Sequence, residues 1–357
     1  MVTIGVEEEF HIVSAETGEP EPAARRVLRG VDAQPELQRS VIETATDIHT
    51  GLSQLRADLV ARRQALVEAA GRHGLAVVAA GTVPGAGSRP TRVYPNERYE
   101  WMAQEYRQLV DEQQVCACQV QVGVPDRDLA VRITRRIRAW LPALLAMSVS
   151  SPLFAGQDTG YASYRSIVAS RWPTVGPPPD VHSADEYDMV VTTLVDSGVI
   201  SDAAMMYFDA RPSPRYPTVE IRIADGCPLV DDAVLLAALA RALVVTASAQ
   251  DAAGAPPPEA PQVLLRAATW RAARSGLEGH LVDPLTRRAV PAPDRVAALL
   301  AHLRPALEEH GDWDLAASLA EALLKRGTSA QRQRAVLRDG GSHGDVVSAL
   351  AAETAAG

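Results

Sequence analysis

The sequence predicts an α+β fold, and three patterns lead to that prediction. Short stretches that alternate apolar and polar residues, as strands do, recur through residues 3–224. Segments with apolar residues at helical spacing lie between them, but strands and helices do not follow the regular alternation of a parallel sheet. From residue 229 onward the pattern is almost wholly helical, with a proline-rich surface connection at 254–261.

The expected elements follow in chain order. Residues 3–13 form the first strand, in which Glu7 and Glu9 share one face. Apolar residues at helical spacing predict a helix at 52–70, closed by two glycines. We expect further strands at about 38–46, 75–80, 115–124, 207–211 and 218–224, and further helices at about 96–114 and 129–148. A last short helix or tail follows the glycine pair 340–341.

The composition is that of an ordinary folded protein. Of the 357 residues, 47% are hydrophobic and 22% charged, enough for a substantial core. The formal net charge of −9 argues against nucleic acid or an anionic membrane as the main partner, since both favour basic surfaces. The most apolar stretch, 234–247, contains Arg241 and is too short to span a bilayer, so we expect a buried helix. That helix could also pack between two copies of the chain, which makes a homodimer compatible with the sequence.

Three cysteines and the first residues bear on the compartment. The first residues lack the basic and apolar segments of a secretory leader, and an odd number of cysteines does not suit a disulfide framework. We therefore expect a reducing, cytoplasmic environment. Cys116 and Cys118 would point to the same side of a strand, and we expect both to be buried apolar residues.

Glu7 and Glu9 project into the same space from the first strand. Two neighbouring carboxylates repel each other, and burying them is costly unless a cation compensates. A hard divalent cation such as Mg²⁺ or Mn²⁺ is the natural partner, because it prefers oxygen ligands. The alternative is a solvated face of an edge strand.

Other charged residues lie in strand-like or loop-like segments. Glu220 and Arg222 share one face of a strand, either as a simple ion pair or as a metal-binding carboxylate beside an arginine that neutralises a transferring phosphoryl group. Glu43 is a further carboxylate in a strand-like segment. Arg165 and Arg211 lie in segments rich in Pro, Gly and Ser, where each is either a surface arginine or a clamp for a substrate carboxylate.

Taken together and in order, these segments resemble the type 2 glutamate–cysteine ligase family, and within it the YbdK-type carboxylate–amine ligases of bacteria. The resemblance covers about residues 3–340. The segments that carry it are Gly5-Val6-Glu7-Glu8-Glu9-Phe10, Ile42-Glu43-Thr44-Ala45-Thr46-Asp47, Asn96-Glu97-Arg98-Tyr99, Ser151-Pro152, Asp158-Thr159-Gly160-Tyr161-Ala162-Ser163-Tyr164-Arg165, Arg211-Pro212-Ser213-Pro214, Pro217-Thr218-Val219-Glu220-Ile221-Arg222 and Gly276-Leu277-Glu278-Gly279.

The resemblance implies a glutamine-synthetase-like catalytic fold, in which a curved antiparallel sheet forms a funnel with helices packed outside. It implies a single catalytic domain over 1–357, mostly helical at 229–357. It also implies a reaction of small molecules: ATP, held by Mg²⁺ or Mn²⁺, phosphorylates a carboxylate, often the γ-carboxylate of glutamate, and an amine displaces phosphate. By the same resemblance, the metal ligands are Glu7, Glu9, Glu43, Glu220 and Gln119, the nucleotide-binding residues are Gln121 and Arg222, the substrate-binding residues are Arg165 and Arg211, and the catalytic residues are Arg222 and Arg211.

The chain departs from the family pattern at three positions. Gln119, Gln121 and Val83 stand where the family usually has histidine. Glutamine keeps a carbonyl oxygen that can ligate Mg²⁺, but it binds more weakly and cannot carry a proton. Besides an active ligase, the sequence therefore allows a non-catalytic or altered-substrate descendant that binds nucleotide or amino acid, or a related kinase-like use of ATP.

Overall fold

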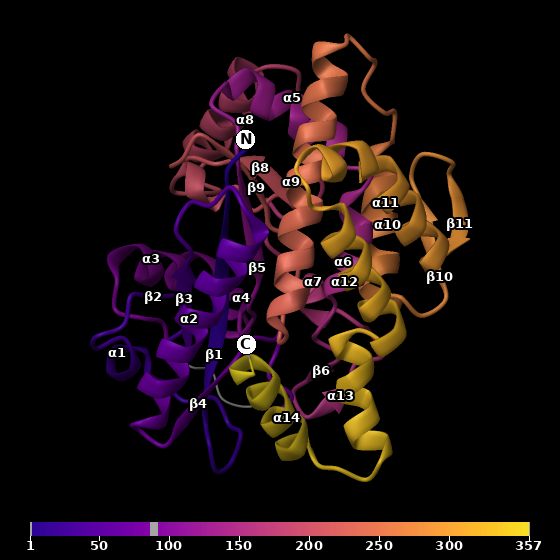
Figure 1. Cartoon of the computed structure of the whole chain (residues 1–357). Coiled ribbons are helices and arrows are strands. Elements are labelled where there is room, and N and C mark those ends of the chain that lie inside the picture. Colours follow the sequence, from indigo (N-terminus) through magenta and orange to yellow (C-terminus); the bar gives the residue numbers. More distant parts are fainter. Residues whose placement is uncertain (1, 86–91, 357) are drawn as a thin grey trace.

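The computed structural model describes residues 2–85 and 92–356 (Figure 1). Within these ranges, seven strands form one antiparallel sheet in the order β2-β3-β1-β5-β9-β8, and β4 pairs with the last residues of β1. The strands of this sheet are β1 (Ile4–Ser14), β2 (Gln34–Pro35), β3 (Val41–Ala45), β4 (Leu75–Val78), β5 (Cys118–Gly123), β8 (Ala210–Pro212) and β9 (Thr218–Ile221). The predicted α+β class is confirmed.

Strand register separates the sheet into an apolar face and a polar face. Val6 of β1 lies opposite Val120 of β5, which lies opposite Ile221 of β9, and all three side chains are buried. One residue along, Glu7 lies opposite Gln119 and projects from the other face, because successive residues of a strand alternate. The alternation predicted from the sequence is therefore present in the structure.

Helices cover the apolar face of the sheet. The long helix α9 (Val230–Ala252) packs against β1 and β5, and α2 (Leu52–Gly71) packs on α9 and β4. The helix α5 (Arg127–Ile137) packs on α9 and on β8 and β9, and α11 (Ala292–Glu309) and α12 (Trp313–Arg326) pack on the side of α9 away from β1, so α9 is surrounded by other elements of its own chain (Figure 1). These contacts form the largest apolar core and hold the polar face of the sheet in place.

The remaining elements complete the outside of the molecule. They are α1 (Ala24–Val27), α3 (Glu97–Tyr106), α4 (Gln108–Asp111), α6 (Leu141–Ser148), the hairpin of β6 (Leu153–Phe154) and β7 (Gln157–Asp158), α7 (Tyr164–Ala169), α8 (Ala184–Asp196), the 3₁₀ turn η1 (Ala203–Met205), α10 (Gln262–Ser275), the hairpin of β10 (His280–Asp283) and β11 (Arg288–Pro291), α13 (Ser329–Arg338) and α14 (His343–Ala355). The cysteines Cys116, Cys118 and Cys227 are free and buried, as predicted for the first two.

Glu8, the middle carboxylate of the first strand, points into the core instead of the polar face. It forms a buried ion pair with Arg63 of α2, whose Nε donates to Glu8 Oε2 at 3.0 Å. The same guanidinium donates to the carbonyls of Pro228 and Cys227 at 2.6 and 2.7 Å. Because both charges are paired and hydrogen-bonded, Glu8 has a structural role that its neighbours do not share.

Several expected boundaries are wrong for identifiable reasons. The helix expected at 96–114 is broken at Arg107, which has φ of 52°, into α3 and α4. The helix expected at 129–148 is two helices, because Pro142 in the first turn of α6 has no N–H to continue the preceding helix. The hairpin β10–β11 interrupts a region that was expected to be almost wholly helical.

The expectation that the apolar helix is too short to span a bilayer is also wrong. Within the described ranges one helix, Val230–Ala252, is long and apolar enough to cross a membrane, since it continues beyond the apolar stretch at both ends. In its most apolar window 78% is buried inside the protein. The prediction of a buried helix is therefore confirmed.

Candidate active site

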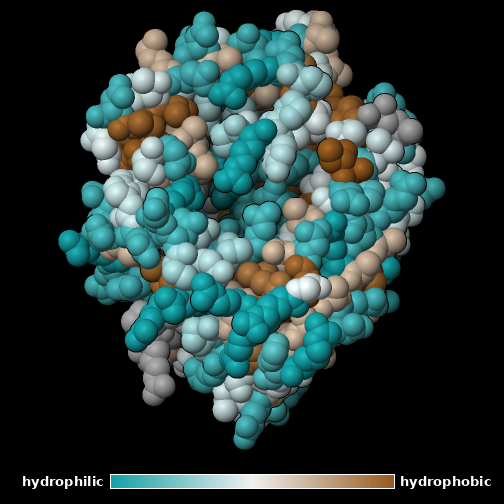
Figure 2. Space-filling model, turned by 90° about the vertical axis from the view of Figure 1, so that its left-hand side faces the viewer, coloured by the Kyte–Doolittle hydropathy of each residue, from teal (hydrophilic) through white to brown (hydrophobic). Residues whose placement is uncertain are grey.

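A cavity of about 460 Å³ lies over the polar face of the sheet. Residues of β1, β3, β5, β8 and β9 form its floor, and residues of α3, α7 and α10 contribute to its walls. The face of the molecule turned toward the viewer in Figure 2 is mostly hydrophilic and is hollowed near its centre. All nine residues that the sequence singles out as site candidates line this cavity: Glu7, Glu9, Glu43, Gln119, Gln121, Arg165, Arg211, Glu220 and Arg222.

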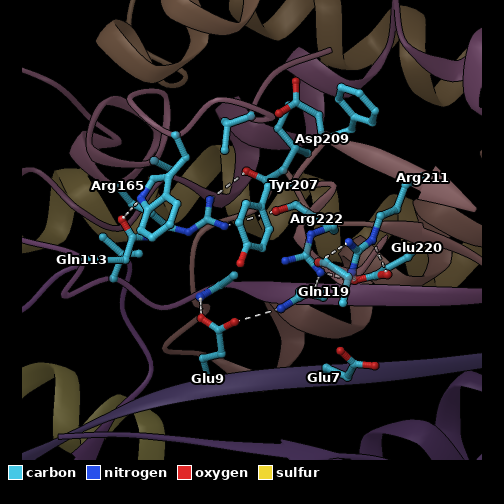
Figure 3. A pocket seen from close by; sticks show the side chains of 18 of the residues that line it. Glu7, Glu9, Gln113, Gln119, Arg165, Tyr207, Asp209, Arg211, Glu220 and Arg222 are labelled. Atoms are coloured by element: carbon cyan, nitrogen blue, oxygen red, sulfur yellow. Dashed lines mark hydrogen bonds and ion pairs between the residues drawn. The ribbon is translucent and has the colours of Figure 1, made fainter. Parts of the chain in front are cut away.

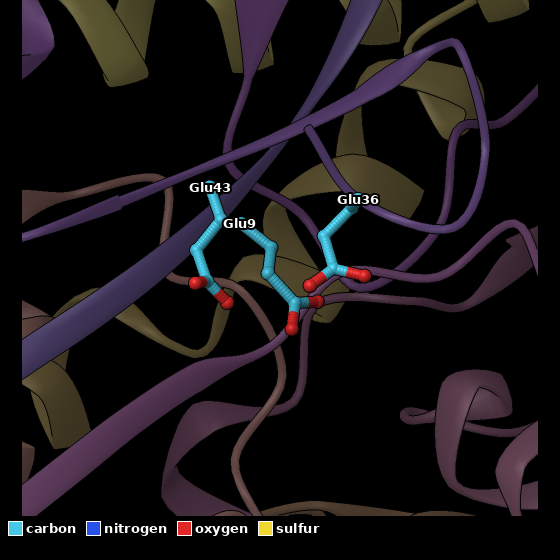
Figure 4. A group of neighbouring side chains, drawn as sticks. All are labelled: Glu9, Glu36 and Glu43. Atoms are coloured by element: carbon cyan, nitrogen blue, oxygen red, sulfur yellow. The ribbon is translucent and has the colours of Figure 1, made fainter. Parts of the chain in front are cut away.

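Three carboxylates from three strands or their loops meet at one end of the cavity. Glu9 lies directly opposite Glu43 in the β1–β3 register, and Glu36 follows β2. One carboxylate oxygen of each lies within 4.8 Å of those of the other two (Figure 4). Glu36 was not among the predicted ligands, since the strand expected there began at residue 38.

Burial and mutual repulsion make this cluster reluctant to ionise. Desolvation, followed by the charge of Glu36, raises the pKa of Glu9 to about 7. Burial and the neighbouring carboxylates raise the pKa of Glu43 well above its usual range, and burial raises those of Glu36 and Glu7. Each of these shifts favours the protonated form, so the carboxylates of the cluster would be fully charged only with a compensating cation.

Hydrogen bonds to the cluster leave its charge uncompensated. Glu9 accepts from the Ala117 N–H at 2.7 Å and from Gln119 Nε2 at 2.8 Å, and Glu36 accepts from the backbone at Leu37. Within residues 2–85 and 92–356, none of the three cluster carboxylates forms an ion pair with an arginine, lysine or histidine. Oxygen donors with excess negative charge fit a hard divalent cation.

Glu220 differs from the cluster, because two arginines neutralise it. Arg211 Nε donates to Glu220 Oε2 at 2.9 Å, and Arg222 pairs with the other oxygen. Burial alone would raise the pKa of Glu220, but the charges of Arg222 and Arg211 lower it to about 2. The ion pair weighed from the sequence is therefore present here, and a metal-binding role of Glu220 stays a prediction.

The predicted arginines are placed differently from one another (Figure 3). Besides Glu220, the Arg211 guanidinium donates to the carbonyls of Ala204 and Met206 at 2.7 and 2.8 Å, so it holds Glu220 and a nearby loop. Arg165 donates to the carbonyls of Arg222 and of residue 223 at 3.2 and 3.3 Å, and its Nε is buried with no partner among the described residues. A role of either at the substrate stays a prediction.

Gln119 and Gln121, which stand where the resemblance leads us to expect histidine, connect carboxylates of β1 with residues of β9 and with Arg222. Gln119 donates to Glu9 and accepts from Arg222 through its carbonyl oxygen. Gln121 donates to Glu7 at 3.1 Å and accepts from Thr218 at 2.5 Å. Val83 is fully buried in an apolar cluster away from the cavity. Their roles in metal and nucleotide binding stay predictions.

Sequence reasoning missed a second group of residues in the cavity. Asp209 lies just before β8, Arg98 and Tyr99 come from α3, and Trp270 comes from α10. Asp209 could have been predicted, because it lies two residues before Arg211 in a strand-like segment and would therefore share its face. The others come from helices whose facing surface the sequence pattern could not orient toward the sheet.

Solved structures identify the class of fold. The chain is similar to a bifunctional glutathione synthetase from Pasteurella multocida, with a TM-score of 0.72 at 16% identity over 99% of this chain and 52% of that chain. It is also similar to a glutamate–cysteine ligase from Francisella tularensis in complex with AMP, with a TM-score of 0.67 at 11% identity over 100% and 89%. The protein shares the fold of these two structures, and its antiparallel sheet with helices packed outside agrees with the fold that the resemblance implied.

Sequence comparison identifies the family. The glutamate-cysteine ligase family 2 (GCS2) matches residues 3–351, and the chain belongs to this family. It is 48% identical over 99% of its length to a Frankia casuarinae protein with the provisional name glutamate–cysteine ligase 2-2, and it spans 42% of that protein. It is 46% identical over 99% to a Mycolicibacterium smegmatis protein with the same provisional name, and it spans 90% of that one.

Proposed function

We propose that this protein is an ATP-dependent carboxylate–amine ligase of the glutamate–cysteine type. The observation that carries the proposal is the cluster of Glu9, Glu36 and Glu43, which forms no ion pair with a basic side chain among the described residues and lies in one cavity with Arg222. Family membership and the fold of the AMP-bound relative support a nucleotide in this cavity. We further propose that 1–357 acts as one catalytic domain in a reducing, cytoplasmic environment, which the three free cysteines favour.

The charges of the cavity suit a nucleotide bound together with a divalent cation. The cation can bind the carboxylates, and the phosphate groups can lie by the arginines. Glu7, Glu9, Glu36 and Glu43 would hold Mg²⁺ or Mn²⁺, and Gln119 borders them. When bound, the metal would neutralise phosphate oxygens and orient the transferring group. Arg222, on the strand beside Gln119, would stabilise charge on that group as it moves.

The proposed reaction has two steps. An oxygen of the substrate carboxylate, glutamate by family resemblance, attacks the γ-phosphorus of ATP, forming an acyl phosphate and releasing ADP. The nitrogen of an amine, cysteine by the same resemblance, then attacks the acyl carbon, and phosphate leaves with the bonding electrons. Arg211 would keep Glu220 and Arg222 in place, because its guanidinium is tied to Glu220 and to two backbone carbonyls.

Phosphate release tests the proposal directly. Folded protein is incubated with ATP, Mg²⁺, glutamate and a panel of amines that includes cysteine, and phosphate and product mass are measured. We expect phosphate only when an amine is present, with an amide of matching mass. Arg222→Gln should lower the rate about 10²–10³-fold, since it removes a preorganised charge, whereas Arg29→Gln at an exposed position should not.

A second candidate, a descendant that binds without turnover, follows from the glutamines. Gln119 and Gln121 occupy Glu9 and Glu7 with amide hydrogen bonds, which a metal would have to displace or share. Calorimetric binding of ATP without phosphate release from any acid and amine pair would favour this candidate. Wild-type turnover would exclude it. An assembly of two chains stays a prediction, which light scattering in solution would check.

A further inference from the structure

Asp209 is a buried carboxylate in the cavity that the proposed mechanism leaves unused. Its side chain is 8% exposed and lines the cavity. Among the described residues it makes no side-chain hydrogen bond and no ion pair. A carboxylate so deeply buried is normally paired, so its isolation indicates that its partner is supplied by a ligand.

The backbone holds Asp209 in a fixed position. Its N–H donates to the Gly176 carbonyl at 2.8 Å, and its own carbonyl accepts from the Arg222 N–H at 2.9 Å. The following residue, Ala210, begins β8 in register with β9. Asp209 is therefore carried by the same strand pair that positions Arg211, Glu220 and Arg222.

Asp209 lies at a different end of the cavity from the acidic cluster. In Figure 3 the guanidinium of Arg165 lies between Glu9 and Asp209. The positive charge of Arg165 acts on both carboxylates, which places it near each of them. Burial raises the pKa of Asp209 to about 7, against a weaker lowering by Arg165.

The aromatic lining of the cavity favours an organic cation. Tyr207 and Phe208 directly precede Asp209 and line the cavity with it, as do Trp172 and Trp270, and the rings of Trp172 and Tyr207 meet edge to face with centroids 5.8 Å apart. Aromatic faces and a single carboxylate together recognise an ammonium group. A metal ion would be poorly held, since Asp209 belongs to no group of three possible metal ligands among the described residues.

We propose that Asp209 binds the ammonium group of the amine substrate and removes its proton before the attack on the acyl group. This inference rests on the proposed ligase function. The ammonium gives one proton to the Asp209 carboxylate and becomes a neutral amine. The amine nitrogen then forms the bond to the acyl carbon as the carbon–oxygen bond to phosphate breaks. Its second proton leaves with phosphate, and Asp209 returns its proton to water.

Hydroxylamine separates this role from carboxylate activation. It is mostly unprotonated at neutral pH and attacks acyl phosphates without help from a base, so it reports formation of the activated acid. Asp209→Asn, the exposed control Asp196→Asn and the wild type are compared with ATP, Mg²⁺ and glutamate. Each protein is assayed once with hydroxylamine and once with an amine substrate. That amine is cysteine, or whichever amine of the panel gives the highest rate.

We expect Asp209→Asn to lower kcat/KM for the amine about 10²–10⁴-fold, the range of general base catalysis. Hydroxamate formation by the same variant should stay within about threefold of the wild type, which also shows that the variant is folded. Asp209→Glu should recover part of the amine reaction. Asp196→Asn should match the wild type with both nucleophiles.

Three outcomes would overturn the assignment. Wild-type rates of Asp209→Asn with the amine would show that no proton passes through this side chain. A raised KM for glutamate with both nucleophiles would place Asp209 at the ammonium of the acid substrate instead. Loss of both reactions would place it in carboxylate activation or in the fold. A wild type that is inactive with every nucleophile would count against the ligase proposal itself.

Discussion

Replacing Glu43 by glutamine tests whether the cavity holds a divalent cation. The change keeps the shape of the side chain and removes one charge from the cluster. Glu43 makes no side-chain hydrogen bond among the described residues, so its removal breaks none. The variant should therefore be more stable than the wild type without metal and less responsive to metal.

The size of both effects follows from the geometry. The three ligand oxygens lie within 4.8 Å of one another, and two unit charges at that distance repel by about 3.5 kcal/mol at an effective dielectric constant of about 20. Proton uptake already relieves much of this, as the raised pKa of Glu43 indicates. We expect a remaining gain of about 1–3 kcal/mol, or ~1–4 °C in Tm, for metal-free Glu43→Gln in mildly alkaline buffer.

Thermal unfolding with and without Mn²⁺ measures both effects. Mn²⁺ at a hundred times its Kd should stabilise the wild type by about 2.7 kcal/mol, and Glu43→Gln by about 1 kcal/mol if one lost ligand weakens binding about thirtyfold. The matched control is Glu68→Gln, at an exposed position of α2. A variant that is less stable without metal and keeps the full Mn²⁺ shift would refute the metal site.

Three further predictions concern the same charges. The pKa of Glu9 is higher in the folded protein (about 7) than its ordinary 4.5, so the stability it contributes is present below pH 4.5 and is lost as pH rises through about 7. We expect metal-free protein to lose about 2–3 kcal/mol over this window in urea unfolding, and saturating Mn²⁺ to flatten the loss. Arg63→Met should lower the free energy of unfolding by about 3–5 kcal/mol because it leaves Glu8 buried and unpaired. Adding Glu8→Leu in the same chain should recover most of that stability, and an unchanged urea midpoint of Arg63→Met would contradict this prediction. Gln119→His should raise Mn²⁺ affinity about tenfold in calorimetry, since an imidazole nitrogen is a stronger metal ligand than the carbonyl oxygen of an amide. An unchanged affinity would mean that Gln119 does not border the metal.

Much of the sheet was predictable because the strand pattern is local. A period of two in residues 3–13 places Glu7 and Glu9 on one face, whatever the neighbouring strands are. The same rule places Glu220 beside Arg222. Motif order then identified the family, and through it the fold, since no local pattern specifies which strands pair.

The lengths and breaks of helices were less predictable. Arg107 adopts a positive φ, which is not expected from an arginine in the sequence. The turn that joins β10 to β11 lies in a segment whose pattern favours neither helix nor strand. Glu36 escaped notice for a similar reason. It follows a strand of only two residues, Gln34–Pro35, too short to show any alternation.

The sequence does not predict which positively charged group pairs with each carboxylate. Glu8 is paired with an arginine from a helix 55 positions away, and Glu220 with one on the neighbouring strand. Glu9 and Glu43 face each other instead, and Glu36 joins them. Carboxylates with similar neighbours in the sequence are thus either paired with an arginine or grouped with other carboxylates. The proposed metal site consists of the acids that, among the described residues, folding leaves without an ion pair to a guanidinium, and Asp209 lies apart from them in the same cavity.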